Sequence, residues 1–398
     1  MLEKKSFLLN SKKYKQNLKK TKKIFDFFYS DYKNFDIPLL QSYEKSYNLD
    51  FSSTTIKKFF KYENIIILGM GGSILGTKSI YSFFKKKIKK KVFFFDNLDQ
   101  NLYLEFKKIK NLRNSCFIVV SKSGNTLETI LNLSGIFSQS LMKNKLLFIT
   151  EIKNNLLMSI ANKFNAEIIE HKDFIGGRYS VLSEVGMLPA ELMGLNIKKF
   201  KNINKFLKKK SFVNSLIKNV AGIYTLQKKR NNSVILNYDS DLNDLSFWYQ
   251  QLVAESLGKK GKGISPTLSH MPKDNHSMLQ LYLDGPMNKF YTFLSTNSKD
   301  VTNKFYKNVI VKNIKFLRNK NLKSVLNAQR EATMNVFKSK NIPFRHFVFN
   351  KKNEEELVEI LTFFVLETIL LSRLLKLNAF DQPAVEQVKI ETKKNLLR

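Results

Sequence analysis

The chain has 398 residues, 43% of them apolar, and a chain of this size can bury two ordinary domain cores, which excludes general disorder. Lysine and arginine number 68 against 33 aspartates and glutamates, and the formal charge of +35 would suit nucleic acid or an acidic surface as a partner. Nearly all of the excess is lysine, however, which favours a lysine-rich surface over a nucleic-acid groove, where arginine is the preferred reader.

The cysteine content and the apolar segments limit the cellular setting. Cys116 is the only cysteine, so an internal disulfide and a multi-cysteine metal site are excluded, and we expect this residue in the core. Residues 1–16 are basic but lack an apolar stretch of signal-peptide length, which predicts a cytoplasmic protein. The most apolar long segment, 357–375, carries Glu359, Glu367 and Arg373, which would be costly in lipid. We therefore expect an amphipathic helix there and no membrane partner.

Short β-rich runs alternate with segments of helical period, which is the signature of parallel sheets covered by helices on both faces. In the first half we expect strands at residues 64–68, 92–96, 116–120, 145–150 and 166–170, with helices between them. After a lysine-rich stretch at 198–210 the pattern resumes with a strand at 233–238, a helix at 241–257, a strand at 290–295, a helix at 322–339, a strand at 345–349 and a long helix at 353–377. This recurrence predicts an α/β protein with two open, mainly parallel sheet domains.

We expect four regions along the chain: an N-terminal helical segment at 1–45, α/β domains at 46–197 and 198–377, and a C-terminal helical arm at 378–398.

A glycine-rich turn follows the first expected strand, at residues 69–76 (GMGGSILG). Glycines in such a strand-to-helix turn let backbone amides approach a ligand closely. This turn nearly matches two nucleotide-binding motifs, but it lacks a required residue of each. A dinucleotide fingerprint requires glycine where Ile74 stands, although Asp96 imitates its ribose-binding acid, and a triphosphate loop requires lysine directly after Gly76. The sequence therefore disfavours nucleotide binding.

A second turn, at residues 121–126 (SKSGNT), follows the strand at 116–120 and opens a helix with the pattern of a capping box. Three hydroxyls, a glycine and the positive end of a helix converge there, which suits a single phosphate monoester. An ordinary Ser/Thr helix cap is the alternative. A third cluster at 175–180 (IGGRYS) places Arg178 beside two glycines, where a guanidinium can stabilise developing negative charge.

Together these segments resemble the glucose-6-phosphate isomerase (phosphoglucose isomerase) family, which is built from two sugar-isomerase (SIS) domains. The resemblance continues with residues 250–259 (QQLVAESLGK), 273–280 (KDNHSMLQ) and 380–389 (FDQPAVEQVK), in the order of the family. The chain resembles the compact bacterial type of this family more than the long eukaryotic type. Asn125 stands where many members have threonine, and Pro383-Ala384 stands where a glycine is usual.

The resemblance implies a role for each matching residue. Glu255 would move the proton between C1 and C2 of the open-chain sugar, Arg178 would stabilise the enediolate, and His276 and Lys389 would open and close the sugar ring. The implied phosphate and sugar contacts are Gly72, Ser73, Ser121, Lys122, Ser123, Thr126, Gly177, Gln251 and Gln382. In this family the histidine reaches the site from the neighbouring subunit, which implies a homodimer with shared sites. No metal and no cofactor is implied.

These residue types suit the reaction. A carboxylate can take and return a proton next to a carbonyl, because the intermediate is planar and one base on one face serves both carbons. Histidine suits ring opening near neutral pH. Three alternatives remain open: an isomerase that also accepts mannose 6-phosphate, a non-catalytic regulator that binds phosphosugars, and a nucleic-acid-binding protein supported by charge alone.

Overall fold

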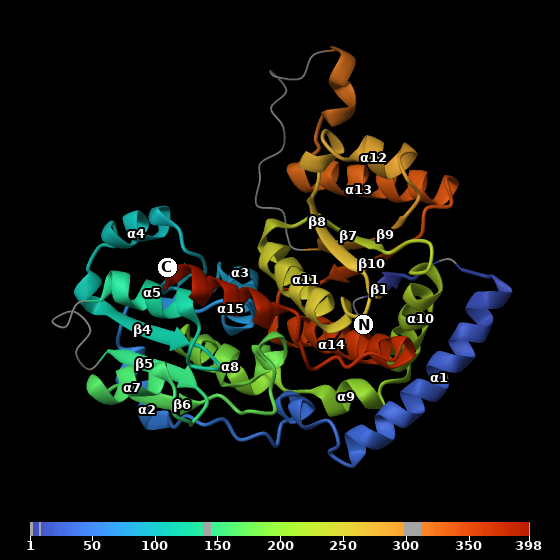
Figure 1. Cartoon of the computed structure of the whole chain (residues 1–398). Coiled ribbons are helices and arrows are strands. Elements are labelled where there is room, and N and C mark those ends of the chain that lie inside the picture. Colours follow the sequence, from blue (N-terminus) through green and yellow to red (C-terminus); the bar gives the residue numbers. More distant parts are fainter. Residues whose placement is uncertain (1–2, 8, 138–144, 298–311, 398) are drawn as a thin grey trace.

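Two five-stranded sheets form the framework of the protein (Figure 1). The computed structural model describes residues 3–7, 9–137, 145–297 and 312–397. The first sheet has the order β3-β2-β4-β5-β6 and is parallel throughout. The second has the order β1-β10-β9-β7-β8 and is parallel except where β1 pairs with β10. The predicted fold class, an α/β protein with two mainly parallel sheets and a C-terminal helix, is confirmed.

The first half of the chain contains, in order, β1 (Glu3–Lys5), α1 (Lys12–Lys33), α2 (Ser53–Phe60), β2 (Asn64–Leu68), α3 (Leu75–Phe84), β3 (Lys91–Phe95), α4 (Gln100–Lys107), β4 (Ser115–Val120), α5 (Leu127–Ile136), β5 (Leu146–Thr150), α7 (Leu156–Lys163), β6 (Glu167–Glu170) and α8 (Glu184–Leu192). The second half contains α9 (Ile203–Lys208), α10 (Lys210–Leu226), β7 (Asn232–Asn237), α11 (Asn243–Leu257), β8 (Ser265–His270), α12 (Leu279–Asp284), β9 (Lys289–Thr296), α13 (Leu322–Ser339), β10 (Phe344–Phe349), α14 (Glu354–Leu375) and α15 (Val385–Leu396).

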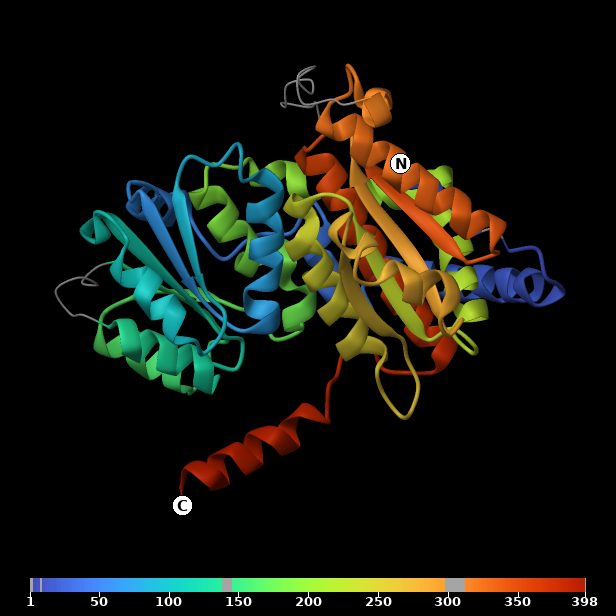
Figure 2. The same cartoon turned by 90° about the horizontal axis from the view of Figure 1, so that it is seen from above.

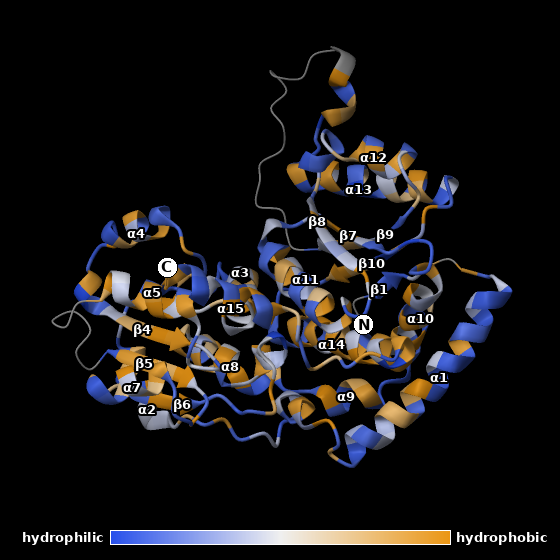
Figure 3. Cartoon of the chain, in the orientation of Figure 1, coloured by the Kyte–Doolittle hydropathy of each residue, from blue (hydrophilic) through white to orange (hydrophobic). Residues whose placement is uncertain are grey.

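The central strands are apolar because helices cover both faces of each sheet. Every residue of β2 and β4 is buried, Cys116 included, and β4 and β5 are correspondingly hydrophobic in Figure 3. Two strands were not expected. β1 has three residues and two of them are lysines, and β8 is an edge strand that contains Pro266, which an edge tolerates because its amide is not needed in the ladder.

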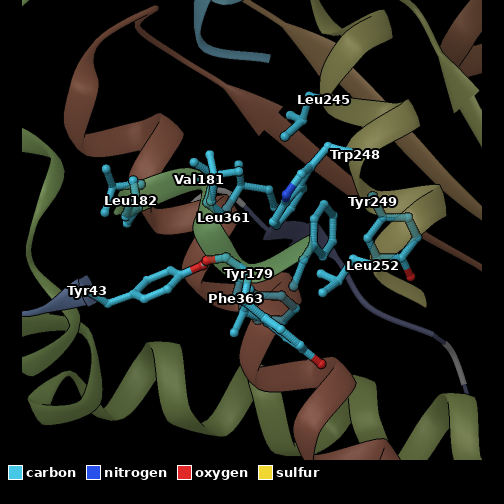
Figure 4. Packing of buried hydrophobic residues seen from close by; sticks show 14 of the residues in the cluster. Tyr43, Tyr179, Val181, Leu182, Leu245, Trp248, Tyr249, Leu252, Leu361 and Phe363 are labelled. Carbon is cyan, nitrogen blue, oxygen red and sulfur yellow. The ribbon is translucent and has the colours of Figure 1, made fainter. Parts of the chain in front are cut away.

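The two sheets share one hydrophobic core through a layer of helices. Figure 1 shows α3 and α11 between the sheets and α14 below the second sheet, and α11 contacts both of the other two helices. In Figure 4, Trp248 and Leu252 of α11 pack among Leu361 and Phe363 of α14 and Tyr179 of the first half. The segment around Tyr179, which follows the last strand of the first sheet, is thereby packed against a helix of the second half.

The expectation of an amphipathic helix at 357–375 is wrong. α14 is buried on nearly all sides, and both Glu359 and Glu367 lie in the interior. Glu367 forms a buried ion pair with Arg345 of β10, so its charge is compensated inside the core. None of the helices in the described ranges combines the length and the apolar character needed to cross a bilayer.

The lysines lie almost entirely on the surface. Within the described ranges, Lys201 is the one lysine among the buried residues. The C-terminal helix α15 also has no buried residue, and Figure 2 shows it standing clear of the body of the protein.

Candidate active site

The glycine-rich turn at residues 69–76 brings the motifs of the first half together. β2 ends at Leu68, and the turn continues as a short 3-10 helix at Gly71–Ser73 before α3 begins. A β-carbon placed on Gly72 would lie 2.2 Å from the carbonyl carbon of Gly177 and 2.5 Å from the amide nitrogen of Arg178. One on Gly69 would lie 3.2 Å from the carbonyl oxygen of Val120, at the end of β4. The absence of side chains therefore lets the three predicted clusters meet at the carboxyl edge of the first sheet.

Arg178 is buried, at 2% exposure, and its guanidinium is bound on every side. Nε donates to the hydroxyl of Ser256 at 2.8 Å, and Nη2 donates to the carbonyl oxygens of Ala379 at 2.5 Å and Asp381 at 3.1 Å. Nη1 donates to Gln382 Oε1 at 2.8 Å and to Glu255 Oε2 at 3.1 Å. The Nη1 edge is thus the part of the group that faces the predicted base.

Glu255 lies in the last turn of α11, and both of its carboxylate oxygens are bound. Gln251, four residues earlier on the same face of the helix, donates from Nε2 to Oε1 at 2.8 Å, while Arg178 holds Oε2. The side chain of Glu255 stays 32% exposed. A carboxylate that is fixed yet open to a ligand is suited to act as a base.

A cavity of about 460 Å³ opens beside Glu255, between α3, α11 and the end of β3. Its lining consists of Leu75, Lys78, Asp96, Phe247, Gln250, Gln251, Ala254 and Glu255. Asp96 is ion-paired with Lys78 at 2.6 Å. The carboxylate that imitates a ribose-binding acid in the sequence is therefore already engaged by a lysine of this chain.

The loop at residues 121–126 presents hydroxyls at the end of β4. Ser121 is buried, and its Oγ lies 2.7 Å from the hydroxyl oxygen of Thr126. The predicted capping box does not form, because Thr126 occupies the N-cap position of α5 without a capping hydrogen bond and its hydroxyl faces Ser121 instead. Ser123 Oγ accepts from the amide of Asn125 at 3.3 Å.

Lys122 supplies positive charge to this loop. Its Nζ donates to the carbonyl oxygen of Asp173 at 2.6 Å and lies 3.7 Å from Glu151 Oε1. Burial lowers the pKa of Lys122, and the nearby carboxylates partly oppose that shift. Ser73 lies at the end of the neighbouring glycine turn and is 9% exposed. Together these groups place hydroxyls and one ammonium group at the same edge of the sheet, an arrangement that can bind an anion.

His276 and Lys389 lie apart from this cluster. His276 follows the 3-10 helix Lys273–Asn275 and is exposed. Lys389 lies on α15, where it is exposed and ion-paired with Glu386 at 2.6 Å. Within the described ranges, no hydrogen bond or ion pair joins either residue to Glu255 or Arg178. The described residues likewise contain no group of three or more His, Cys, Asp or Glu side chains placed to hold a metal ion.

Sequence reasoning missed several residues that bind the predicted catalytic side chains. Ser256 and the carbonyl groups of Ala379 and Asp381 hold Arg178, and Lys259 in turn holds Asp381. Ser256, Lys259 and Asp381 lie inside the segments 250–259 and 380–389, so the motifs contained them. Their side chains offered no chemistry that distinguished them from ordinary polar residues.

Comparison with known proteins agrees with this architecture. The family profile described as "Phosphoglucose isomerase" matches residues 39–395. The glucose-6-phosphate isomerase of Methanocaldococcus jannaschii is 33% identical over 339 residues, covering 82% of this chain and 83% of the relative. That of Campylobacter jejuni is 32% identical over 349 residues, covering 82% and 84%. In fold, the chain is similar to a crystal structure of a glucose-6-phosphate isomerase from Chlamydia trachomatis, with a TM-score of 0.72, 18% identity and coverage of 86% of this chain and 72% of that one.

The two mainly parallel sheets, joined through one layer of helices, define an α/β fold of the kind seen in that crystal structure. The profile match and the relatives place the chain more narrowly: it belongs to the phosphoglucose isomerase family.

Proposed function

We propose that this protein is an aldose-ketose isomerase that interconverts glucose 6-phosphate and fructose 6-phosphate through an enediolate. The observation that carries the proposal is the Glu255 carboxylate, held at 2.8 Å by Gln251 and at 3.1 Å by Arg178 beside an open cavity. Membership of the phosphoglucose isomerase family and relatives named glucose-6-phosphate isomerase support the choice of substrate.

Glu255 is the base in this proposal. It removes the proton from C2 of the open-chain aldose and returns it to C1, and a base of this kind contributes about 100- to 10,000-fold to the rate. The intermediate carries negative charge on its oxygens, and Nη1 of Arg178 is the donor nearest to the base. Because Arg178 is 2% exposed and already bound through Nε and Nη2, its position costs no reorganisation during the reaction.

The phosphate group binds to the hydroxyl-rich loop in this proposal. Ser121, Lys122, Ser123 and Thr126 hold it, with Ser73 at the adjoining turn, and the binding energy orients the reactive end of the sugar toward Glu255. In this proposal Gly72, Gly177 and Gln382 lie between the phosphate loop and Glu255. Because the two glycines have no side chains, their backbones pack closely beside that of Arg178. Gln382 accepts a hydrogen bond from Arg178 Nη1.

Ring opening is assigned to His276 and Lys389, and we propose that a homodimer completes the site for this step. Both side chains are exposed, and α15, which carries Lys389, is unburied along its length. A second copy could therefore receive these groups or supply them. A cytoplasmic location remains an expectation from the sequence.

The central experiment is an assay of the purified protein on fructose 6-phosphate and mannose 6-phosphate with no added metal or nucleotide. Glu255→Gln should lower kcat by at least about 100-fold while the sugar phosphate still binds, because the amide keeps the shape but cannot accept the proton. Glu105→Gln, at an exposed carboxylate 65% accessible on α4, is the matched control. A fully active Glu255→Gln enzyme would falsify the assignment. Wild-type protein that binds fructose 6-phosphate without exchanging a carbon-bound proton with solvent would instead identify a regulator.

The shared site has its own test. His276→Ala and Glu255→Gln proteins are purified separately, mixed, and allowed to exchange subunits. If each site takes the two residues from different subunits, mixed dimers regain part of the activity. No recovery after verified exchange contradicts the shared site but leaves the role of Glu255 intact.

A further inference from the structure

The segment 378–382, here called the C-terminal strap, joins α14 to α15 and runs past the active-site arginine. It contains little apolar burial to hold it in place: Ala379 is buried, but Phe380 is 45% exposed and the remaining side chains of the strap are exposed as well. Polar contacts must therefore fix its path, and Lys259 makes three of them.

The ammonium group of Lys259 is saturated by the strap. It donates to the carbonyl oxygen of Asn378, to the carbonyl oxygen of Asp381 at 2.5 Å and to Asp381 Oδ1 at 2.6 Å. An ammonium group has three N–H donors, so each donor has one acceptor. The Lys259 side chain is 12% exposed, which strengthens these charge-assisted bonds relative to bonds in open water. Asp381 Oδ2 also accepts from the side-chain amide Nδ2 of Asn378, at 3.1 Å.

The same strap binds Arg178. The carbonyl oxygen of Asp381 accepts from both Lys259 and Arg178, and the carbonyl oxygen of Ala379 accepts from Arg178 Nη2 and from the hydroxyl of Tyr179 at 3.0 Å. Two cations therefore share one backbone oxygen. Any movement of the strap would change the acceptors of Arg178 Nη2, and a rotated guanidinium would no longer present Nη1 to Glu255.

Lys259 is also fixed relative to the base. It follows Glu255 by four residues and lies just past the end of α11, where its backbone pairs with Lys262 in a tight turn. Gly261 and Gly263 of this turn have φ values of +66° and +122°, which glycine adopts readily. The lysine is thus placed next to the end of the helix that carries the base, and the strap is hydrogen-bonded to it.

We propose that Lys259 is a positioning residue for the isomerisation: by anchoring the strap it holds the carbonyl groups of Ala379 and Asp381 against Arg178 and so keeps the guanidinium aligned with Glu255. The proposal rests on the proposed function of the site. It assigns no contact between Lys259 and the substrate. The Lys259 ammonium also lowers the pKa of Asp381, so this carboxylate stays ionised and paired at neutral pH.

The test compares Lys259→Met, Lys259→Arg and the control Lys260→Met, which makes the same change at the exposed neighbouring lysine. Lys259→Met should lower kcat by about 10- to 100-fold, the range expected when a catalytic group shifts by up to 1 Å, while KM changes by less than about threefold. Lys259→Arg should recover most of the lost kcat, because a guanidinium can still donate to the strap carbonyl groups. Lys260→Met should match wild type.

Asp381→Asn serves as the second variant if Lys259→Met does not fold. It removes the charge but keeps the carbonyl that both cations bind, so its loss of kcat should be smaller. The exchange of the sugar C2 proton with solvent is measured in parallel, because this exchange reports the proton transfer itself. The exchange rate is expressed per folded active site, so a loss of folded protein does not change it. Wild-type kcat in Lys259→Met, or a loss expressed only as a higher KM, overturns the proposal. An inactive wild-type protein overturns the proposed function instead.

Discussion

Gly72 lies against Gly177 so closely that an alanine there tests how the active site is assembled. The added β-carbon would lie 2.2 Å from the Gly177 carbonyl carbon. Ordinary contact between carbon atoms requires about 3.5 Å, so one backbone must move by about 1.3 Å. Neither neighbour is a flexible side-chain end, and Arg178 follows directly after Gly177. The displacement therefore falls on the residue that faces Glu255.

Two effects should follow from Gly72→Ala. Overpacking at a rigid contact costs about 1–3 kcal/mol of unfolding free energy. A shift of about 1 Å in a catalytic group costs on the order of 100-fold in rate, so kcat/KM for fructose 6-phosphate should fall by about that factor. A coupled assay measures the second effect and urea unfolding the first.

Gly176→Ala is the matched control, because its β-carbon would meet only the Tyr179 ring at 3.4 Å, which is ordinary contact. This variant should keep nearly wild-type activity and stability. If Gly72→Ala behaved like the control in both assays, the close approach of the two glycine segments would not govern the geometry of the site.

Two further predictions concern buried ionisable groups. Arg345→Met leaves the Glu367 carboxylate buried without its cation, so urea unfolding should show a loss of about 3–5 kcal/mol, and adding Glu367→Met should restore much of it; an unchanged single variant would contradict this account. His171 is 1% exposed, and burial lowers its pKa from 6.5 to about 4, so between these pH values the unfolded chain binds a proton that the folded chain does not. Stability should therefore fall as the pH drops through that window, and the slope should be shallower in His171→Phe; identical slopes would refute the assignment.

The sequence predicted the central strands well, for a physical reason. β2 and β4 are buried on both faces, so their apolar runs are continuous and their bounds are sharp. β8 lacked such a run, because an edge strand tolerates polar residues and Pro266. The environment of α14 was predicted wrongly, because a charged residue within an apolar helix usually marks a face exposed to solvent. Glu367 is instead buried and ion-paired with Arg345, which lies on the preceding strand β10.

The candidate site likewise contains segments that could be predicted from the sequence and contacts that could not. Glycine turns and hydroxyl clusters are local patterns, so residues 69–76 and 121–126 could be identified from their sequence alone, whereas residues 250–259 were identified through their resemblance to the family. The contacts of Lys259 could not, because its acceptors are backbone oxygens as much as 122 residues away and backbone oxygens have no sequence signature.

The sequence by itself therefore determined the fold class, the family resemblance, the lysine-rich surface and the segments proposed to carry the chemistry, because each depends on composition or on neighbours within a few residues. Tertiary structure alone decided how these segments meet. It brought Gly72 against Gly177, aimed the Nη1 edge of Arg178 at Glu255 and tied the C-terminal strap to both, since such contacts depend on the packing of two sheets through one helical layer. It also left His276 and Lys389 exposed, away from the base.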